Sequence, residues 1–214
     1  MKHKLKGLYV ITDKKLIERQ FFIETVEKAL LGGANVLQLR EKDTDPKEII
    51  YLGKELLNLA NKYSVPLIIN DSPELTIEIG AHGVHLGQYD TNIEQARNIL
   101  GEEKIIGVSC YGQLELGLDA KAKGADYITF GTPYDTPTKP GRKPTPFSTL
   151  VEAKARITDI PIFAIGGITK ENAKDVLDTG VDGIAVITSV FGSADPEGSS
   201  RELSEIANRQ SQVD

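Results

Sequence analysis

The chain alternates between short apolar runs and longer amphipathic segments. Eight of the apolar runs are five or six residues long and rich in β-branched residues, and most are almost continuously hydrophobic, as is typical of parallel strands buried on both faces. They occupy residues 8–12, 35–39, 66–70, 83–87, 104–109, 126–131, 161–166 and 183–188. The pattern therefore predicts eight strands, each separated from the next by a connecting segment.

Several of the connecting segments carry the start and stop signals of helices. The segment 21–33 ends in two glycines, which favour a helix stop. The next segment opens with Asp45 as the predicted N-cap and Pro46 at the first helical position. The segment 170–180 has helical periodicity and ends in a glycine. These segments predict helices between the strands.

A short motif recurs where a predicted helix leads into a strand. It reads Gly-Ala-Asn-Val, Gly-Ala-His-Gly, Gly-Ala-Asp-Tyr and Gly-Val-Asp-Gly at residues 33–36, 80–83, 124–127 and 180–183. These motifs precede the second, fourth, sixth and eighth predicted strands, so the repeating unit is one helix and one strand, with an indication of pairing.

Eight such units in 214 residues predict an α/β fold, a single-domain (β/α)8 TIM barrel that spans residues 1–214. The alternative is an open doubly wound sheet, which often has a glycine-rich nucleotide turn after its first strand. Here Thr12-Asp13-Lys14 follows the first strand, which favours the barrel.

Composition limits the partners. The net charge of −6 and the pI near 5.2 argue against a general nucleic-acid binder. No apolar run reaches membrane-spanning length, and the first residues lack a signal-peptide core. The single Cys110 excludes an internal disulfide and fits a reducing cytosol. We therefore expect a cytoplasmic protein with neither a nucleic-acid nor a membrane partner.

Polar side chains should gather at the carboxyl ends of the strands, where barrels of this kind place their active sites. After the second strand, alternation puts Gln38, Arg40 and Lys42 on one face and Leu37 and Leu39 on the other. If the leucines pack on the outer helices, the polar residues point into the mouth of the barrel. The alternative is a solvated charge run at a strand end.

Carboxylates follow the third and fourth strands. Asn70-Asp71 ends the third strand, and the fourth runs out to Asp90. Two carboxylates at adjacent strand ends can hold Mg²⁺, which takes one or two carboxylates together with phosphate oxygens. The alternative is that each aspartate caps the following helix. For the pair taken together we favour the metal site.

The ends of the last strands suggest a phosphate site. Gly166-Gly167 follows the seventh strand and Ile187-Thr188-Ser189 the eighth, and barrels often bind phosphate with the backbone of these two loops. Between them and the sixth strand lies the irregular stretch 131–144, which contains four prolines. Its hydroxyls and cations predict a lid over an anionic ligand, and they come from Thr136, Thr138, Lys139, Arg142 and Lys143.

Together these stretches resemble the thiamine-phosphate synthase (thiamine-phosphate pyrophosphorylase) family across nearly the whole chain. The matching text is QLREK (38–42), IIND (68–71), GVHLGQYD (83–90), IGVS (106–109), GADYITFG (124–131), TPTK (136–139), AIGGI (164–168) and GIAVITS (183–189). The resemblance implies an Mg²⁺-dependent transferase of thiamine biosynthesis. It would join an aminopyrimidine methyl diphosphate to a thiazole ethyl phosphate, or to the carboxylated form of the latter, and yield thiamine phosphate and diphosphate.

The resemblance also implies a role for each matching residue. The pyrimidine diphosphate would be held by Gln38, Leu39, Arg40, Glu41, Lys42, Asn70, Ser109 and Lys139. The thiazole phosphate would be held by Thr136, Pro137, Thr138, Gly167, Ile187 and Thr188. Asp71 and Asp90 would hold Mg²⁺, and the catalytic set would be Arg40, Lys42, Ser109 and Lys139. The chain departs from the family pattern at Thr132, Asp135 and Thr188.

The implied reaction is a dissociative displacement in which the thiazole nitrogen, which carries no proton to remove, attacks a pyrimidine cation. It needs no strong general base, in agreement with the scarcity of histidine at the strand ends. One alternative is a thiazole tautomerase, which should have a histidine after the fifth strand, where this chain reads Ser109-Cys110-Tyr111-Gly112. Another is a non-catalytic barrel that binds phosphorylated ligands. A homodimer is a further expectation from the family.

Overall fold

Strands form at all eight of the predicted apolar runs in the computed structural model, which describes residues 5–136, 141 and 143–209. They are β1 (Gly7–Ile11), β2 (Val36–Leu39), β3 (Leu67–Asn70), β4 (Gly83–Leu86), β5 (Ile105–Ser109), β6 (Tyr127–Gly131), β7 (Ile162–Ile165) and β8 (Gly183–Val186). All neighbouring strands are parallel, and β8 pairs with β1 to close the barrel. The predicted (β/α)8 fold is thereby confirmed.

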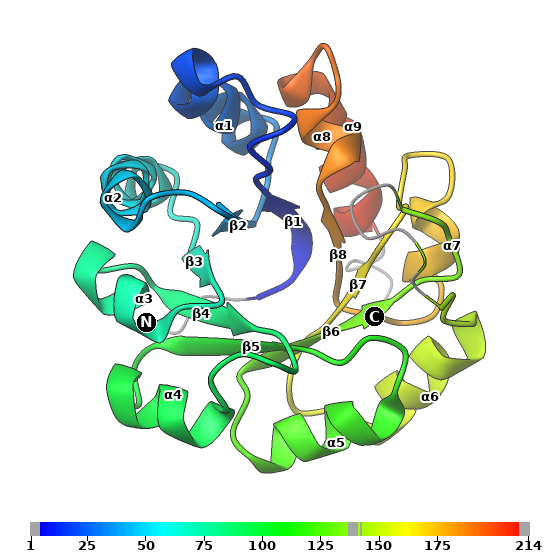
Figure 1. The fold of residues 1–214 in the computed structure, drawn as a ribbon. Coiled ribbons are helices and arrows are strands. Elements are labelled where there is room, and N and C mark those ends of the chain that lie inside the picture. The colour runs from blue at the N-terminus through cyan, green and yellow to red at the C-terminus, as the bar shows by residue number, and fades with distance from the viewer. Residues whose placement is uncertain (1–4, 137–140, 142, 210–214) are drawn as a thin grey trace.

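Helices surround the barrel on the outside (Figure 1). A short 3-10 helix, η1 (Arg19–Phe21), precedes the first of them. The α-helices are α1 (Phe22–Leu31), α2 (Pro46–Lys62), α3 (Pro73–Ile79), α4 (Ile93–Leu100), α5 (Leu114–Ala122), α6 (Phe147–Arg156), α7 (Ala173–Leu177), α8 (Thr188–Phe191) and α9 (Pro196–Arg209). The last helix packs on α1, α7 and β1 and so covers this side of the barrel. No helix within the described part of the chain has the length and apolarity to cross a membrane.

Side-chain alternation divides the core into two clusters. Residues such as Leu37 and Leu39 point outward and pack with the helices. A smaller cluster fills the interior of the barrel, and three aromatic rings dominate it, those of Tyr9, Tyr127 and Phe163. These rings meet edge to face with centroids 5.3–5.9 Å apart, a favoured arrangement for buried aromatic side chains. The lower barrel is thus a packed core, and any ligand site must lie above it.

Caps account for the helix starts near the predicted site. Asp45 caps α2 as predicted, because its side chain accepts a hydrogen bond from the Lys47 backbone N–H. Ser72 caps α3 and Asn92 caps α4. Neither Asp71 nor Asp90 is therefore the N-cap of the following helix, and both carboxylates remain available for the metal role that the sequence suggested.

The recurring junction motif has a structural explanation at the amino ends of the strands. Its glycines, at positions 33, 80, 124 and 180, all have positive φ angles between 80° and 97°, which a side chain would strain. The polar residue two positions after each glycine accepts a hydrogen bond from a backbone N–H of the preceding odd-numbered strand, at 2.8–3.0 Å. The four junction residues are Asn35, His82, Asp126 and Asp182, and their donors are the backbones of Leu8, Leu67, Ile106 and Ile162. Each pair of strands is therefore fixed by the same local device.

Candidate active site

A pocket opens at the carboxyl ends of the strands, above the aromatic core. Residues within or directly after all eight strands line it. Among them are eight of the residues that the sequence predicted for the site, namely Gln38, Arg40, Lys42, Asn70, Asp71, Ser109, Thr136 and Ile187. The closed barrel thus brings together polar groups that are up to about 100 positions apart in the chain.

The end of β2 supplies the cationic wall of the pocket. Gln38, Arg40 and Lys42 line the pocket, and the alternate leucines pack outward, as the sequence predicted. The Arg40 guanidinium donates to the Asp13 carboxylate at 3.1 Å, and its backbone N–H donates to the Thr12 hydroxyl at 3.0 Å. Arg40 is therefore held in place from the end of β1, with its charge beside the pocket.

Two residues of the predicted set turn their side chains away from this wall. Leu39 is buried among the outer core residues. Glu41 pairs with Arg19 at 2.8 Å and accepts a hydrogen bond from the Thr44 hydroxyl at 3.1 Å. Neither lines the pocket, so only their backbone groups remain for a ligand there. Alternation explains this placement, because the QLREK stretch exposes only every second side chain to the barrel mouth.

A carboxylate pair lies beside these cations, at the ends of the next two strands. Asp71 has a left-handed backbone with φ at 67°, and its carboxylate lies 3.6 Å from the Lys42 ammonium. Burial raises the pKa of the Asp71 carboxyl, and the neighbouring Asp90 carboxyl raises it further, whereas Lys42 and Arg40 lower it. Asp90 is exposed and accepts a hydrogen bond from the Gly87 backbone N–H at 2.7 Å. Two anionic groups in contact with few cations make this a place where a divalent cation would be stabilised.

No group of three or more acidic, histidine or cysteine side chains gathers as a metal site among the residues that the structure describes. Asp71 and Asp90 nevertheless supply two carboxylates in contact with each other. Mg²⁺ uses one or two carboxylates when phosphate oxygens complete its coordination shell.

Hydroxyl groups line the side of the pocket formed by β5 and β6. Ser109 is buried at the end of β5, and its backbone carbonyl accepts a hydrogen bond from the Gln88 side chain at 2.6 Å. The Thr129 hydroxyl is buried in the pocket wall without a hydrogen-bond partner among the described residues. A buried hydroxyl of this kind is costly unless a ligand or water satisfies it. Burial also raises the pKa of the Cys110 thiol to about 12, which makes this residue inert as a nucleophile.

The loop after β7 borders the pocket from the other side. Gly166 lines it, and the Gly166 carbonyl accepts a hydrogen bond from the Thr132 hydroxyl. Gly167 has φ at 59° and lies against the backbone of residues 134–135, since a Cβ there would come within 2.2 Å of the Asp135 carbonyl oxygen. Gly167 therefore seats the loop after β6. It does not line the pocket itself.

The remaining predicted residues fall in two places. Thr188 lies at the start of α8 and lines a second cleft, which shares Arg40 and Lys42 with the main pocket and adds Lys14. Pro137, Thr138, Lys139 and Arg142 lie outside the described residues. Of the proposed lid, the structure therefore describes mainly the residues at its two ends. One of these, Thr136, lines the pocket.

Sequence reasoning did not include His85 in the site, although it lines the pocket from β4. Its Nδ1 atom lies 3.0 Å from the hydroxyl of Tyr127, one layer below. The signal was present in the sequence, because alternation along β4 turns Gly83 and His85 to the interior and Val84 and Leu86 to the helices. Ile11, Gly87 and Ile165 also line the pocket and were not predicted.

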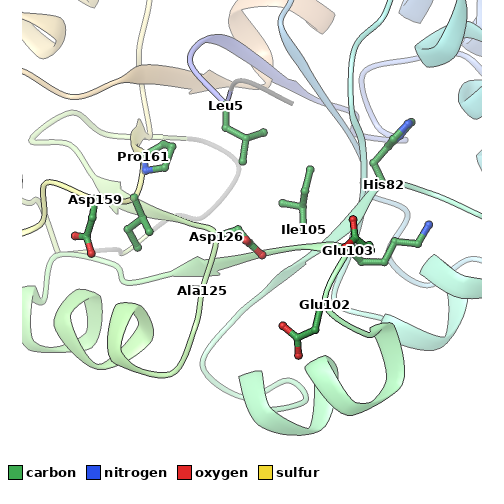
Figure 2. Close-up of a pocket in the computed structure, with 11 residues that line it drawn as sticks. Leu5, His82, Glu102, Glu103, Ile105, Ala125, Asp126, Asp159 and Pro161 are labelled. Atoms are coloured by element: carbon green, nitrogen blue, oxygen red, sulfur yellow. The ribbon is translucent and has the colours of Figure 1, made fainter. Parts of the chain in front are cut away.

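A larger cavity, of about 430 Å³ against about 80 Å³, lies near the amino ends of the strands (Figure 2). The polar groups of Asp126 and Lys104 there are engaged with Arg97 and with the Ala81 carbonyl, respectively. None of the predicted site residues lines this cavity. The smaller pocket, at the carboxyl ends, is the one that carries convergent chemistry.

Fold and site together define a (β/α)8-barrel enzyme with a charged pocket at the carboxyl ends of its strands. A family model described as thiamine monophosphate synthase matches residues 8–190. A thiamine-phosphate synthase from Clostridium novyi (strain NT) is 44% identical over 200 residues, which are 93% of this chain and 97% of the relative. One from Marinobacter nauticus is 46% identical over 186 residues, or 87% and 83% of the two chains.

A solved structure gives the same result. Thiamine phosphate pyrophosphorylase from Pyrococcus furiosus superimposes with a TM-score of 0.87 at 38% identity, covering 95% of this chain and 96% of the other. The chain belongs to the thiamine-phosphate synthase family.

Proposed function

We propose that this transferase of thiamine biosynthesis joins 4-amino-2-methyl-5-(diphosphooxymethyl)pyrimidine to 4-methyl-5-(2-phosphooxyethyl)thiazole, giving thiamine phosphate and diphosphate. The carboxylated thiazole phosphate is an alternative acceptor. One observation carries the proposal: the cations Arg40 and Lys42 and the carboxylate Asp71 line a single pocket, and the Asp90 carboxylate lies against Asp71 at its edge. That is the composition needed to bind a diphosphate and to stabilise its departure.

The reaction is a dissociative displacement. The bond between the pyrimidine methylene and the diphosphate oxygen breaks first, and both electrons leave with the oxygen. The thiazole nitrogen then donates its lone pair to the methylene cation. Arg40 and Lys42 stabilise the charge that develops on the leaving group, with Lys139 added from the sequence. No proton is removed from the nucleophile, so the inert Cys110 thiol and the lack of a strong base after β5 are consistent with this chemistry.

The residues present fit a divalent cation. Burial and the contact with Asp90 both disfavour the charged form of Asp71, and a cation would reverse both effects. Asp71 and Asp90 would hold Mg²⁺, which would neutralise part of the diphosphate charge. Lys42, at 3.6 Å from Asp71, provides positive charge at the same place.

The remaining members of the predicted set orient the substrates. Gln38, Asn70 and Ser109 line the pocket as polar contacts for the pyrimidine part, together with the backbone of Leu39 and Glu41. For the thiazole phosphate the proposed contacts are Thr136, Pro137, Thr138, Gly167, Ile187 and Thr188. The loop after β6, seated on Gly167, would close over the pocket and exclude water from the reactive cation.

The proposal is tested by mixing purified protein with both substrates and Mg²⁺ and measuring diphosphate release and thiamine phosphate formation. Equal amounts of the two products are expected, and only when both substrates and the metal are present. A thiazole tautomerase would change the thiazole alone and release no diphosphate. A non-catalytic binding protein would show substrate binding by calorimetry without any product.

We further propose that the protein acts in the cytoplasm as a homodimer. The free and buried thiol of Cys110 supports a reducing compartment. Sedimentation equilibrium at micromolar concentration would give the mass of two chains if the dimer is correct, and the mass of one chain would reject it.

A further inference from the structure

A chain of four hydrogen-bonded side chains crosses the barrel directly beneath the pocket. The Gln38 side-chain amide donates to the Tyr9 hydroxyl at 2.5 Å. The Tyr9 and Tyr127 hydroxyls lie 2.8 Å apart, and the Tyr127 hydroxyl lies 3.0 Å from Nδ1 of His85. The two ends of the chain, Gln38 and His85, line the pocket, and its two middle members are fully buried.

A consistent direction for the chain starts at Gln38, whose amide N–H donates to the Tyr9 oxygen. Either tyrosine hydroxyl can donate to the other, and in this direction the Tyr9 proton points to the Tyr127 oxygen. The Tyr127 proton then points to Nδ1 of His85, in the tautomer of the ring that accepts there. A neutral imidazole that accepts at Nδ1 carries its own proton on Nε2. The chain therefore fixes two things at once: the orientation of the Gln38 amide and the tautomer of His85.

The two tyrosines are suited to this task because their hydroxyls stay protonated and their rings are closely packed. Burial raises the pKa of both hydroxyls well above the ordinary value for tyrosine. Their rings pack edge to face on each other and on Phe163, and a Cβ at Gly107 would lie only 2.0 Å from the Tyr127 ring. The ring of His85 stacks on that of Tyr127 with an interplanar angle of 23°. Close packing on all sides holds the hydroxyls in line.

We propose that Tyr9 and Tyr127 are positioning residues that determine which pyrimidine the enzyme accepts, by setting the hydrogen-bonding character of Gln38 and His85 at the floor of the pocket. The proposal rests on the pyrimidine substrate of the proposed function. With its NH₂ group turned to Tyr9, Gln38 presents its carbonyl oxygen as an acceptor, while His85 carries a donor on Nε2.

In hydrogen-bonding character, this acceptor and this donor match the two groups on one edge of a 4-aminopyrimidine. The exocyclic amine of that ring donates, and the adjacent ring nitrogen accepts. A 4-oxopyrimidine has the opposite pattern, because its oxygen accepts and its adjacent ring nitrogen carries a proton. Binding the oxo form would leave a donor facing a donor and an acceptor facing an acceptor, at a cost of about 1–3 kcal/mol for each unsatisfied group. The positions of the buried tyrosine protons would thus determine the preference for the 4-amino over the 4-oxo pyrimidine.

The first test is the tautomer of His85 in the ligand-free protein. Nitrogen-15 NMR of histidine-labelled protein, at a pH where the ring is neutral and with His85→Asn to assign the signal, should show the proton on Nε2. In Tyr127→Phe the fixed donor to Nδ1 is removed while the ring stays in place, and the signals of both tautomers should appear. Tyr63→Phe is the matched control, since the Tyr63 hydroxyl also donates a hydrogen bond, to Glu27 at 2.9 Å on the outer side of the barrel.

The second test is substrate preference, measured by calorimetry with the monophosphate of the aminopyrimidine and with its 4-oxo counterpart, neither of which carries the diphosphate leaving group. Wild type and Tyr63→Phe should bind the amino compound more tightly by at least about tenfold. Tyr127→Phe should lose most of this preference. Tyr9→Phe interrupts the chain at another link and should give the same result, and the double variant should lose no more than either single variant.

A His85 ring protonated on Nδ1 in the wild type would overturn the proposal. So would an unchanged amino-to-oxo preference in both folded tyrosine variants. Failure of the proposed function would look different: wild-type protein would release no diphosphate from the two substrates. If Tyr127→Phe does not fold, the Tyr9→Phe variant supplies the same two measurements.

Discussion

Lys42 and Asp71 lie side by side at the mouth of the barrel, with 3.6 Å between the ammonium nitrogen and the nearer carboxylate oxygen. Lys42 follows β2, and Asp71 follows β3, so the contact joins the two neighbouring strand ends that carry the proposed cationic and metal-binding groups. Asp90 extends the same arrangement to the end of β4. The groups that would bind metal and leaving group therefore form one electrostatic unit, and changing one of them alters the others.

Arg40→Ala and Lys42→Ala should each depress turnover strongly while the protein remains folded. Each removes a positive charge that stabilises the departing diphosphate, an effect on the order of 10²-fold or more in kcat. Lys139→Ala is expected to behave alike on the basis of the sequence. Steady-state rates of diphosphate release and circular dichroism provide the measurements. Arg156→Ala, which removes an exposed pair with Glu152 on the outer face, is the control, and near-normal turnover of Arg40→Ala and Lys139→Ala would contradict the assignment.

Asp71→Asn should raise the thermal stability of the metal-free protein at neutral pH and abolish most of its activity. The folded-state pKa of Asp71 is raised, so its ionised form destabilises the folded state. That penalty is fully present above the folded-state pKa and disappears as the pH falls below the value in the unfolded chain. The gain in Tm should therefore be seen at pH 7 and vanish in strong acid.

Asp43→Asn is the matched control for this stability change. Asp43 also has a left-handed backbone, with φ at 57°, but its side chain is exposed, so burial imposes no penalty on its charge that the substitution could relieve. Its Tm should stay unchanged at both pH values. A fall in the Tm of metal-free Asp71→Asn at pH 7 would show that the ionised Asp71 side chain stabilises the fold. That result would contradict its assignment to a carboxylate pair that is unfavourable without a bound cation.

Gly167→Ala should weaken the packing of the loop after β6 against the loop after β7. The substitution forces a Cβ to within 2.2 Å of the Asp135 carbonyl oxygen and 2.8 Å of the Tyr134 Cβ. Gly80→Ala imposes left-handed strain, with φ at 80° and ψ at 17°, but its Cβ would meet only the Leu57 side chain, at 3.6 Å. Gly80→Ala should cost about 1–2 kcal/mol of unfolding free energy, and Gly167→Ala roughly 1–3 kcal/mol more. Urea unfolding measures both, and KM for the thiazole phosphate should rise only in Gly167→Ala.

Asp126→Ala should lower stability and leave catalysis unchanged. Asp126 accepts from the Ile106 backbone N–H at 2.9 Å and pairs with Arg97 at 2.7 Å, far from the pocket at the opposite end of the strands. Its loss leaves the N–H of the buried residue Ile106 unsatisfied, at a cost of about 1–3 kcal/mol. The exposed pair of Asp119 with Lys123 is the comparison, and Asp119→Ala should cost less than about 1 kcal/mol. A drop in kcat for Asp126→Ala at 25 °C would indicate an unsuspected link to the active site.

Much of the architecture was predictable from the sequence because each level of organisation gave the same answer. Buried parallel strands read as apolar runs, and Asp45 with Pro46 signals the start of α2. The alternation of side chains along the second strand correctly predicted that Gln38, Arg40 and Lys42 point into the mouth of the barrel. These inferences use short-range patterns, which the sequence states directly.

Other features depend on which residue wins a local competition or on contacts across the barrel. Ser72 caps α3 in place of its neighbour Asp71, since only Ser72 has its side chain directed at the backbone N–H of Leu75. The helix predicted over 170–180 is shorter, because α7 begins only at Ala173. The proximity of Tyr9, Tyr127 and His85 follows from barrel closure and from ring size, neither of which a one-dimensional pattern records.

The four junction residues have a consequence for the opposite end of the molecule. Each ties the first residues of one strand to the start of the next by a contact that a slip of one position would break. The same contact is thus repeated four times around the barrel and sets the register of the strands along its axis. The pocket is built from the carboxyl ends of eight strands, and its groups keep their relative positions only if the strands keep their register. The four junction side chains fix that register at the amino ends.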